Sequence, residues 1–392
     1  MKITMPKGVT AILEKLKQNG FEAYIVGGCV RDMILSRLPQ DWDITTNALP
    51  DQVKSLFDRT YDTGIKHGTV TVRLFDTNWE VTTYRSDGLY EDFRHPNEVF
   101  FTDSLSEDLK RRDFTINAIA YNPKTGFVDE HMGIEDIKKR IIRCVNDPDE
   151  RFGEDALRML RALRFSGQLG FEIEEKTCTA IAKNAPLIAH VSAERIKEEL
   201  DKLIVSDNVK VFGKLWDTGL MEYISEDIFA AGKDCAADLG KLPRDKILRW
   251  AQILKFTKDP RSELKRLRYD NKSANLIIFL CANEKTPIPA DKYGIRKALS
   301  KWGEDKFRLL TEFRFSEDFS EVNSLLDEIL RDGDCISLKQ LALNGRDLES
   351  IGIPKGEALG KALACLLDEV HKNPELNNKE KLLPIAEYFI KK

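Results

Sequence analysis

The pattern of hydrophobic and polar residues changes near residue 145. Before that point, short runs rich in β-branched and aromatic residues alternate with turn residues, which predicts strands. The runs are FEAYIV, DWDIT, GTVTVRL, NWEVTTY, EVFF and TINAIAY. One helix is predicted from Val9 to Gln18, because its hydrophobic residues recur at helical spacing and Gly20 follows as a stop. Residues 1–145 therefore predict an α/β domain.

From Pro148 onwards the hydrophobic residues recur at helical spacing almost to the end of the chain. Gly, Pro and Asn separate the periodic segments, as expected between helices. Examples are ALRMLRALRF, AERIKEELDKLI, RDKILRWAQILK and EALGKALACLLDEV. No internal repeat or heptad run is visible. The remainder predicts an all-α body, and the chain as a whole an α+β fold.

Composition narrows the class of protein. The 392 residues are 42% hydrophobic and 32% charged, and the longest apolar stretch, 276–282, is far too short to cross a bilayer. We expect no membrane segment, and the first residues carry no secretion signal, which favours a cytoplasmic location. Seven scattered cysteines without a C-x-x-C pair argue against a disulfide framework and a zinc site. A net charge of -4 means that any RNA site must be a local basic patch.

The first chemical signal is the segment YIVGGCVRD, in which a predicted strand runs into Gly27 and Gly28 and then into a short helix. Adjacent glycines let the backbone approach a phosphate, the helix start offers free N–H groups, and Arg31 can add charge-assisted hydrogen bonds. A plain strand-to-helix turn would look the same. The segment matches neither the dinucleotide-binding glycine pattern nor a P-loop.

Two acidic residues, Asp41 and Asp43, follow on the next predicted strand. Side chains two apart on a strand point to one face, so both carboxylates should converge, and such oxygen ligands suit Mg²⁺. Most D-x-D pairs are solvated turns, but this one comes about a dozen residues after the glycine turn. Glu80 is the candidate third carboxylate, although it could equally lie on a solvated strand face.

These motifs, in this order, resemble the class II tRNA nucleotidyltransferases, the CCA-adding enzymes, which share a polymerase-β-like superfamily with bacterial poly(A) polymerases. The resemblance spans the whole chain. It rests on Gly27-Gly28-x-x-Arg31-Asp32, Asp41-x-Asp43, Arg111-Arg112-Asp113 and Glu154-Asp155-x-x-Arg158. It implies a nucleotidyltransferase head with a small mixed sheet at 1–145, a helical nucleotide-reading neck at 146–205, a helical body at 206–312 and a tRNA-binding tail at 313–392.

The resemblance also implies roles for single residues. Arg112 would bind a phosphate, and Asp113 would accept a hydrogen bond from the ribose 2′-hydroxyl. Asp155 and Arg158, three apart on a predicted helix, would select the base. Cytosine and adenine both present an amine donor beside a ring-nitrogen acceptor, which an acid and an arginine satisfy, whereas uracil and guanine reverse that order. A simple i,i+3 ion pair is the alternative.

Two further arginines complete the implied nucleotide site. Arg161 lies about 60° around the helix from Arg158 and would extend the basic stripe towards the triphosphate. Arg164 falls about 180° from Asp155, so it would have to reach around the helix or depend on a bend.

The implied activity is addition of C, C and A to the 3′ end of tRNA from CTP and ATP, without a template, by attack of the RNA 3′-hydroxyl with two Mg²⁺ ions. The segment from Tyr84 to Phe101 is predicted to be a mobile loop, a feature expected of enzymes that add all three nucleotides. CC-only addition, A-only addition, poly(A) polymerase activity and a non-catalytic RNA-binding module remain alternatives. No protein partner is implied.

Overall fold

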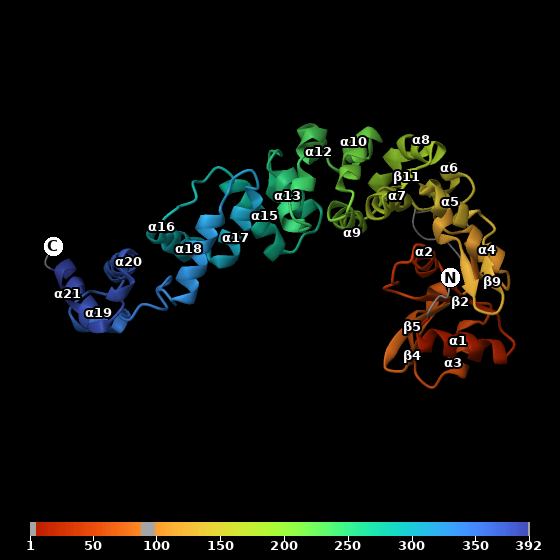
Figure 1. The fold of residues 1–392 in the computed structure, drawn as a ribbon, viewed down its shortest axis with the longest axis horizontal. Coiled ribbons are helices and arrows are strands. Elements are labelled where there is room, and N and C mark those ends of the chain that lie inside the picture. The colour runs from red at the N-terminus through yellow and green to blue at the C-terminus, as the bar shows by residue number, and fades with distance from the viewer. Residues whose placement is uncertain (1–4, 88–98, 391–392) are drawn as a thin grey trace. The chain divides into compact units, whose positions relative to one another are not determined.

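The computed structural model describes residues 5–87 and 99–390, and it separates into two compact units. The first unit comprises Met1–Gly240 and Phe256–Tyr269, and the second comprises Lys241–Lys255 and Asp270–Lys392. The four-part division into head, neck, body and tail stays a prediction. The α+β fold class is confirmed, with one small mixed sheet near the N-terminus and helices in the remainder (Figure 1).

A seven-stranded sheet forms the framework of the first unit, with the strand order β3-β4-β5-β2-β1-β8-β9. The strands are β1 (Ala23–Val26), β2 (Asp43–Thr46), β3 (Thr60–Gly64), β4 (Thr69–Leu74), β5 (Thr77–Thr83), β8 (Ala120–Asn122) and β9 (Gly126–Val128). Only β2 and β5 pair in parallel; all other neighbours are antiparallel. The sheet is therefore mixed, as predicted.

Helices cover the sheet unevenly. The predicted first helix is present as α1 (Lys7–Gln18), and α1 and α3 (Pro50–Leu56) pack against one face of the sheet, where Ile44, Val70 and Val81 are fully buried. Elsewhere on the sheet, α4 (Leu105–Lys110) packs against β1 and β8 through a small core that contains Leu109. The outer strands β5, β4 and β3 extend beyond this core (Figure 1).

The other helices of the first unit follow the sheet in sequence. They are α2 (Gly28–Ile34), α5 (Gly133–Lys139), α6 (Pro148–Glu154), α7 (Leu157–Leu169), α8 (Glu175–Asn184), α9 (Ala193–Ile204), α10 (Lys214–Asp217), α11 (Leu220–Ile224), α12 (Glu226–Ala231) and α14 (Pro260–Arg266). A short parallel pair, β10 (Ile141–Ile142) with β11 (Glu172–Ile173), lies among them. Most of these helices are short, so their stability comes from packing rather than from length.

Two predicted strands differ from the structure. In TINAIAY, Thr115–Asn117 forms a 3₁₀ helix and only Ala120–Asn122 is a strand. In EVFF, β7 (Val99–Phe101) pairs with β6 (Arg85–Asp87) in a separate two-stranded sheet. The ends of the predicted mobile loop are thus a β-pair, and residues 88–98 lie outside the described residues.

The second unit is entirely helical in its described part. Its helices are α13 (Lys246–Leu254), α15 (Asn271–Asn283), α16 (Lys292–Trp302), α17 (Glu304–Phe313), α18 (Ser320–Arg331), α19 (Gly345–Ser350), α20 (Glu357–Lys372) and α21 (Lys379–Ile390). One core gathers around Ile295 and Leu326, and another around Leu348 and Leu366. Arg296 joins α16 to the residues around both cores, because it donates to Asp334 at 2.7 Å and to the carbonyl of His371 at 2.8 Å.

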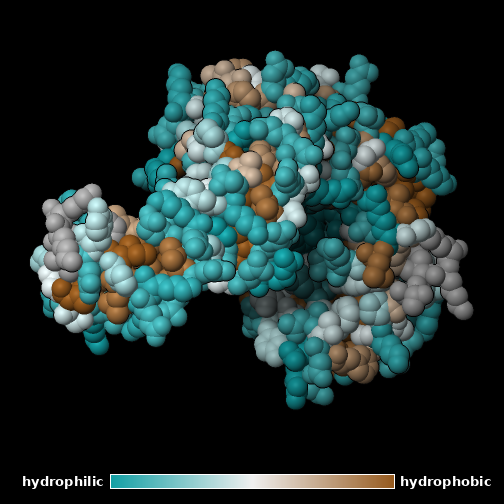
Figure 2. Space-filling model, turned by 60° about the vertical axis from the view of Figure 1, so that its left-hand side comes forward, coloured by the Kyte–Doolittle hydropathy of each residue, from teal (hydrophilic) through white to brown (hydrophobic). Residues whose placement is uncertain are grey.

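Hydrophilic residues cover most of the face that Figure 2 shows. Within the described residues, every helix falls short of the length and apolar character needed to cross a membrane. All seven cysteines are free thiols in this structure.

Candidate active site

The two predicted catalytic acids lie where β2 begins. Asp43 is the first residue of this strand, and Asp41 lies two residues before it, so the prediction that both occupy the strand is wrong for Asp41. Both residues are exposed and line one cleft of about 1160 Å³. Trp42, between them, is 9% exposed. The carboxylates thus face the same cleft although only one is on the strand.

Glu80 belongs to the same acidic group. The parallel pairing of β2 with β5 places Asp43 directly opposite Glu80, so the two side chains share a face. Partial burial raises the pKa of both carboxyls, and the repulsion between acids adds to the effect: Asp41 acts on Asp43, and both act on Glu80. Acids that repel one another in this way gain stability when a cation binds between them.

The guanidinium of Arg112 lies near Asp43, beside the glycine turn. Gly27 has φ +79°, a conformation that favours glycine, and it directly precedes α2. A Cβ atom at this position would lie 3.3 Å from Nη1 of Arg112 and 3.8 Å from Oδ2 of Asp43. Burial raises the pKa of Asp43, and Arg112 opposes that effect. Gly28 starts α2, so the predicted strand-to-helix turn is present, and its role in binding phosphate stays a prediction.

Asp108 in α4 holds Arg112 in place. The Asp108 carboxylate is fully buried and accepts hydrogen bonds from Arg111 at 2.7 Å and from Arg112 at 3.0 Å. Burial alone would raise the pKa of Asp108, but the two guanidinium groups lower it. Nε of Arg112 is buried and has no hydrogen-bond partner among residues 5–87 and 99–390. A bound oxyanion is the kind of ligand that would satisfy such a donor.

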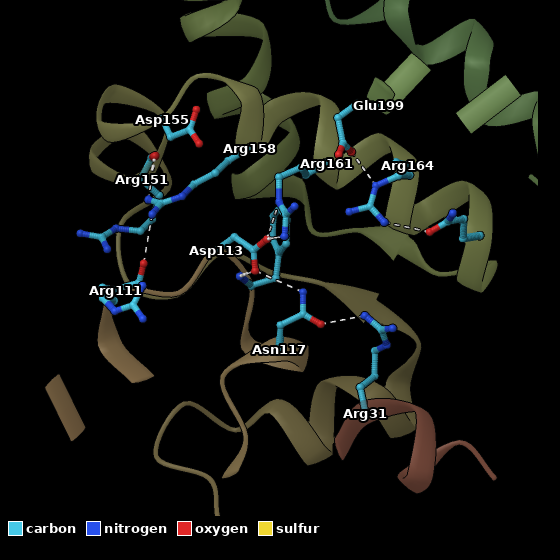
Figure 3. A network of polar contacts seen from close by, with 12 residues as sticks. Arg31, Arg111, Asp113, Asn117, Arg151, Asp155, Arg158, Arg161, Arg164 and Glu199 are labelled. Carbon is cyan, nitrogen blue, oxygen red and sulfur yellow. Dashed lines mark hydrogen bonds and ion pairs between the residues drawn. The ribbon is translucent and has the colours of Figure 1, made fainter. Parts of the chain in front are cut away.

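A second network links the glycine-turn helix to α7 (Figure 3). Arg31 donates to Oδ1 of Asn117 at 2.7 Å, and Asn117 donates to Oδ1 of Asp113 at 3.1 Å. The other oxygen of Asp113 pairs with Arg161 at 2.6 Å. Burial alone would raise the pKa of Asp113, but Arg161 and Asn117 lower it to about 2. The ring of Phe165 lies 5.2 Å from Arg31 and 5.5 Å from Arg161, measured to the guanidinium carbon.

The prediction that one helix carries Asp155 and Arg158 is wrong. α6 ends at Glu154 and α7 begins at Leu157, and Asp155 between them has an extended backbone. Asp155 instead pairs with Arg195 at 2.8 Å. Arg158 bonds to Glu154 and donates to the carbonyl of Arg111 at 3.0 Å, which ties α7 to the segment after α4 (Figure 3). The break releases Asp155 from helical geometry, so helical spacing does not fix its direction.

Arg164 has other partners than the rest of the predicted nucleotide set (Figure 3). It is 9% exposed, pairs with Glu199 of α9 at 2.5 Å and donates to Gln168 at 2.9 Å. Its guanidinium carbon lies 3.9 Å from the centre of the Phe165 ring. In this structure Arg164 therefore joins α7 to α9.

Several residues of the site were missed by the sequence reasoning. Asn117 links Arg31 with Asp113, Asp108 anchors Arg112, and Phe165 contacts three arginines. The signal for Asn117 was a polar residue in the otherwise apolar run TINAIA, four residues after Asp113. No comparable signal marked Asp108, because its role depends on burial.

The acidic residues fit a hard divalent cation. Within the described ranges, no three Asp, Glu, His or Cys side chains form a ready cage for a metal ion. Mg²⁺ rarely uses such a cage; one or two carboxylates commonly hold it together with substrate phosphates. Asp41 and Asp43, exposed in one cleft beside a buried arginine donor, supply this kind of partial site.

The fold and the site together define the class of protein: a nucleotidyltransferase with a mixed sheet that carries acids beside a glycine turn. Residues 23–143 match the family described as the poly A polymerase head domain, and residues 170–239 the family described as a probable RNA- and SrmB-binding site of polymerase A. A CCA-adding enzyme of Lacticaseibacillus paracasei is 38% identical over 98% of both chains, and one of Anoxybacillus flavithermus is 39% identical over 95% of this chain and 94% of its own. The chain belongs to the CCA-adding enzyme family.

Solved structures agree. The CCA-adding enzyme of Bacillus stearothermophilus in complex with CTP has a TM-score of 0.86 and 32% identity, covering 99% of this chain and 98% of that chain. The Thermotoga maritima CCA-adding enzyme complexed with tRNA-CCA has a TM-score of 0.67 at 20% identity, covering 99% and 96%, and at this identity it supports the fold alone. The resemblance found in the sequence motifs is thus confirmed.

Proposed function

We propose that this enzyme adds C, C and A in turn to the 3′ end of tRNA, using CTP and ATP and no nucleic-acid template. The observation that carries the proposal is the position of Asp43. Gly27 and Arg112 lie on one side of it and Glu80 lies on the other, so a nucleotide phosphate and a reacting hydroxyl can meet at one carboxylate. The names of the relatives, together with the CTP complex of the Bacillus stearothermophilus enzyme, support this substrate class.

Asp41 and Asp43 would hold Mg²⁺, with Glu80 as the third acid. When bound, two such ions lower the pKa of the RNA 3′-hydroxyl and neutralise the pyrophosphate leaving group. The protein positions the other groups: the Gly27–Gly28 turn admits the phosphates, and Arg112 donates to them. Asp113, held by Arg161 and Asn117, accepts from the ribose 2′-hydroxyl.

Asp155 and Arg158 would select the base. Asp155 accepts a hydrogen bond from the exocyclic amine of cytosine or adenine, and Arg158 donates to the neighbouring ring nitrogen. Arg161 and Arg31 would lie towards the phosphates, whereas Arg164 acts through its contact with Phe165 rather than on the nucleotide. Uracil and guanine are rejected because they leave a charged group without a partner.

A primer series tests the activity directly. One tRNA should end at the nucleotide before CCA and another in CC, each offered CTP and ATP singly and together. Three additions to the first tRNA and one to the second are expected. Two additions to the first tRNA would identify a CC-adding enzyme. Addition of A to the CC-ended tRNA alone would identify an A-adding enzyme, and a long homopolymer would identify a poly(A) polymerase.

Asp41→Ala tests the catalytic assignment. Incorporation should be lost while tRNA binding stays nearly intact, which also separates an enzyme from a non-catalytic RNA-binding module. Asp149→Asn is a suitable control, because this acid lies in α6 and its contacts are to Lys183 and Asn184 on the surface. Unchanged incorporation by Asp41→Ala contradicts the assignment.

Asp155→Ala tests base selection. Relative to the wild type, the variant should lose most of its preference for CTP over UTP, with a loss of about 10²-fold or more if a buried charged hydrogen bond makes the choice. A variant that still rejects UTP as well as the wild type would show that other groups read the base.

A further inference from the structure

The cleft that contains the catalytic acids extends well beyond them. Besides Asp41, Asp43 and Glu80, it is lined by side chains of β3, β4 and β5, among them Tyr61 and Arg73. The glycine turn and the arginines of α7 are not part of this lining. The cleft and the nucleotide network therefore lie on different sides of Asp43.

The register of the strands defines a row of side chains across the sheet. Tyr61 pairs with Thr71, Thr71 with Glu80, and Glu80 with Asp43, so all four point to one face. Neighbouring strands lie about 4.8 Å apart, which places Tyr61 about 14 Å from Asp43 along this row. Arg73 lies two residues after Thr71 on β4 and shares the same face.

In-line phosphoryl transfer requires the attacking hydroxyl and the leaving group to approach from opposite sides. If the triphosphate binds at Gly27 and Arg112, the RNA 3′ end must enter from the side of β5. We infer that the face formed by β5, β4 and β3 binds the last nucleotides of the tRNA acceptor strand, with Tyr61 stacking on a base upstream of the 3′ end and Arg73 contacting the RNA backbone. This inference rests on the proposed function.

Tyr61 and Arg73 have the properties that the role requires. The Tyr61 side chain is 48% exposed, large and flat, and single-stranded RNA commonly stacks its bases on such side chains. Arg73 is the only basic residue among the described residues that line the cleft, and its contact with Asp76 is long, at 3.5 Å. The carboxylates of the cleft repel an RNA phosphate, whereas the positive charge of Arg73 attracts it.

The hydroxyl and amide side chains near Tyr61 and Arg73 suit a sugar–phosphate backbone. Thr63 and Thr71 share a hydrogen bond of 2.6 Å, and Asn78 lies opposite Arg73 on β5. Thr63 and Asn78 are exposed, carry no charge and can donate or accept, as contacts to ribose and phosphate oxygens require, whereas the buried Thr71 fixes the Thr63 hydroxyl. The face therefore combines stacking, a cation and neutral polar groups in one continuous surface.

Steady-state kinetics of Tyr61→Leu test the inference, with tRNA that lacks CCA as the varied substrate. KM for tRNA should rise about 5- to 150-fold, the range of one lost base stack, while KM for CTP stays unchanged. Tyr61→Phe keeps the ring and should behave as the wild type. Phe127→Leu, an exposed aromatic on β9 at the other end of the sheet, is the matched control. Arg73→Gln should raise KM for tRNA and reduce its salt dependence.

Photocrosslinking tests the same surface without relying on activity. A tRNA ending in CC, with 5-iodocytidine at those two positions, should crosslink to the peptide that contains Tyr61 in the wild-type enzyme. Crosslinks confined to other peptides overturn the inference, as does a Tyr61→Leu variant that raises KM for CTP alone or changes neither KM. A wild-type enzyme that extends no tRNA would instead refute the proposed function.

Discussion

The ion pair between Asp113 and Arg161 offers the sharpest quantitative prediction. The Asp113 carboxyl is buried, and burial alone would raise its pKa, yet the pKa is lowered from 3.8 to about 2. This net change corresponds to about 2 kcal/mol in favour of the ionised form, at about 1.4 kcal/mol per pH unit. Arg161 is the strongest of the groups that lower this pKa, and Asn117 and Arg158 add to its effect, so the interaction of Arg161 with Asp113 should account for the larger part of the figure.

A double-mutant cycle measures the interaction. Asp113→Asn, Arg161→Gln and the double variant would be unfolded in urea at pH 7, and the coupling energy should be about 1 to 2 kcal/mol. Lys176→Gln is the control, because its pair with Asp147 is exposed and its loss should leave the free energy of unfolding nearly unchanged. A coupling energy no larger than the effect of this control would refute the reasoning.

The pH dependence supplies an independent check on the same pair. A carboxyl whose pKa is lowered by folding contributes stability that is fully present above its unfolded pKa, near 4, and is lost as the pH falls through its folded pKa, near 2. The amide of the Asp113→Asn variant does not titrate. The stability gap between wild type and variant should therefore narrow by about 1 kcal/mol between pH 7 and about pH 3. A gap that stays constant would contradict the lowered pKa.

Two further predictions concern a glycine that has no room for a side chain and the pH dependence of activity. Gly133→Ala should lower the free energy of unfolding in urea by several kcal/mol, because a Cβ atom there would collide with the carbonyl oxygen of Thr115. Gly153→Ala is the control: its Cβ atom would meet no atom within 4 Å, so the variant should be as stable as the wild type or more stable. Because burial and repulsion raise the pKa of Asp43, nucleotide incorporation should fall on acidification at a higher pH than an ordinary carboxyl would cause. Added Mg²⁺ should move that acidic limb of the pH–rate profile to lower pH, and an unmoved limb would assign it to another group.

Much of the fold follows from local sequence patterns. The first helix, the central strands and the all-helical remainder are periodic, and their hydrophobic faces indicate burial directly. The error at 115–117 has a physical reason: TINAIA has strand-like composition, but its backbone turns so that Asn117 can bond to Asp113. This local hydrogen bond, together with the one that Asn117 accepts from the distant Arg31, outweighed strand propensity there.

The sequence proposes residues for the candidate site, but it says less about their geometry. The sequence identifies Asp41, Asp43 and Arg112 through ordered motifs, and the structure brings Asp43 and Arg112 together. The helix break at Asp155 was not predictable from spacing, because the nearest glycine, Gly153, lies inside α6 and no proline marks the break. The positions of such side chains depend on partners far away in sequence, here Arg195.

The net charge of the chain gave no indication of its arginine-rich site, and the pairing of the arginines explains why. Each arginine proposed for the nucleotide site bonds to a carboxylate: Asp32 holds Arg31, Asp108 holds Arg112 together with Arg111, Glu154 holds Arg158 and Asp113 holds Arg161. Glu199 holds the neighbouring Arg164 in the same way. A guanidinium has five N–H donors, so one carboxylate orients it without using them all. Such pairing neutralises the positive charge of the arginines, and their remaining N–H donors keep a fixed direction. If this site binds an anionic nucleotide as proposed, we expect the binding to depend on oriented hydrogen bonds more than on a positive local field.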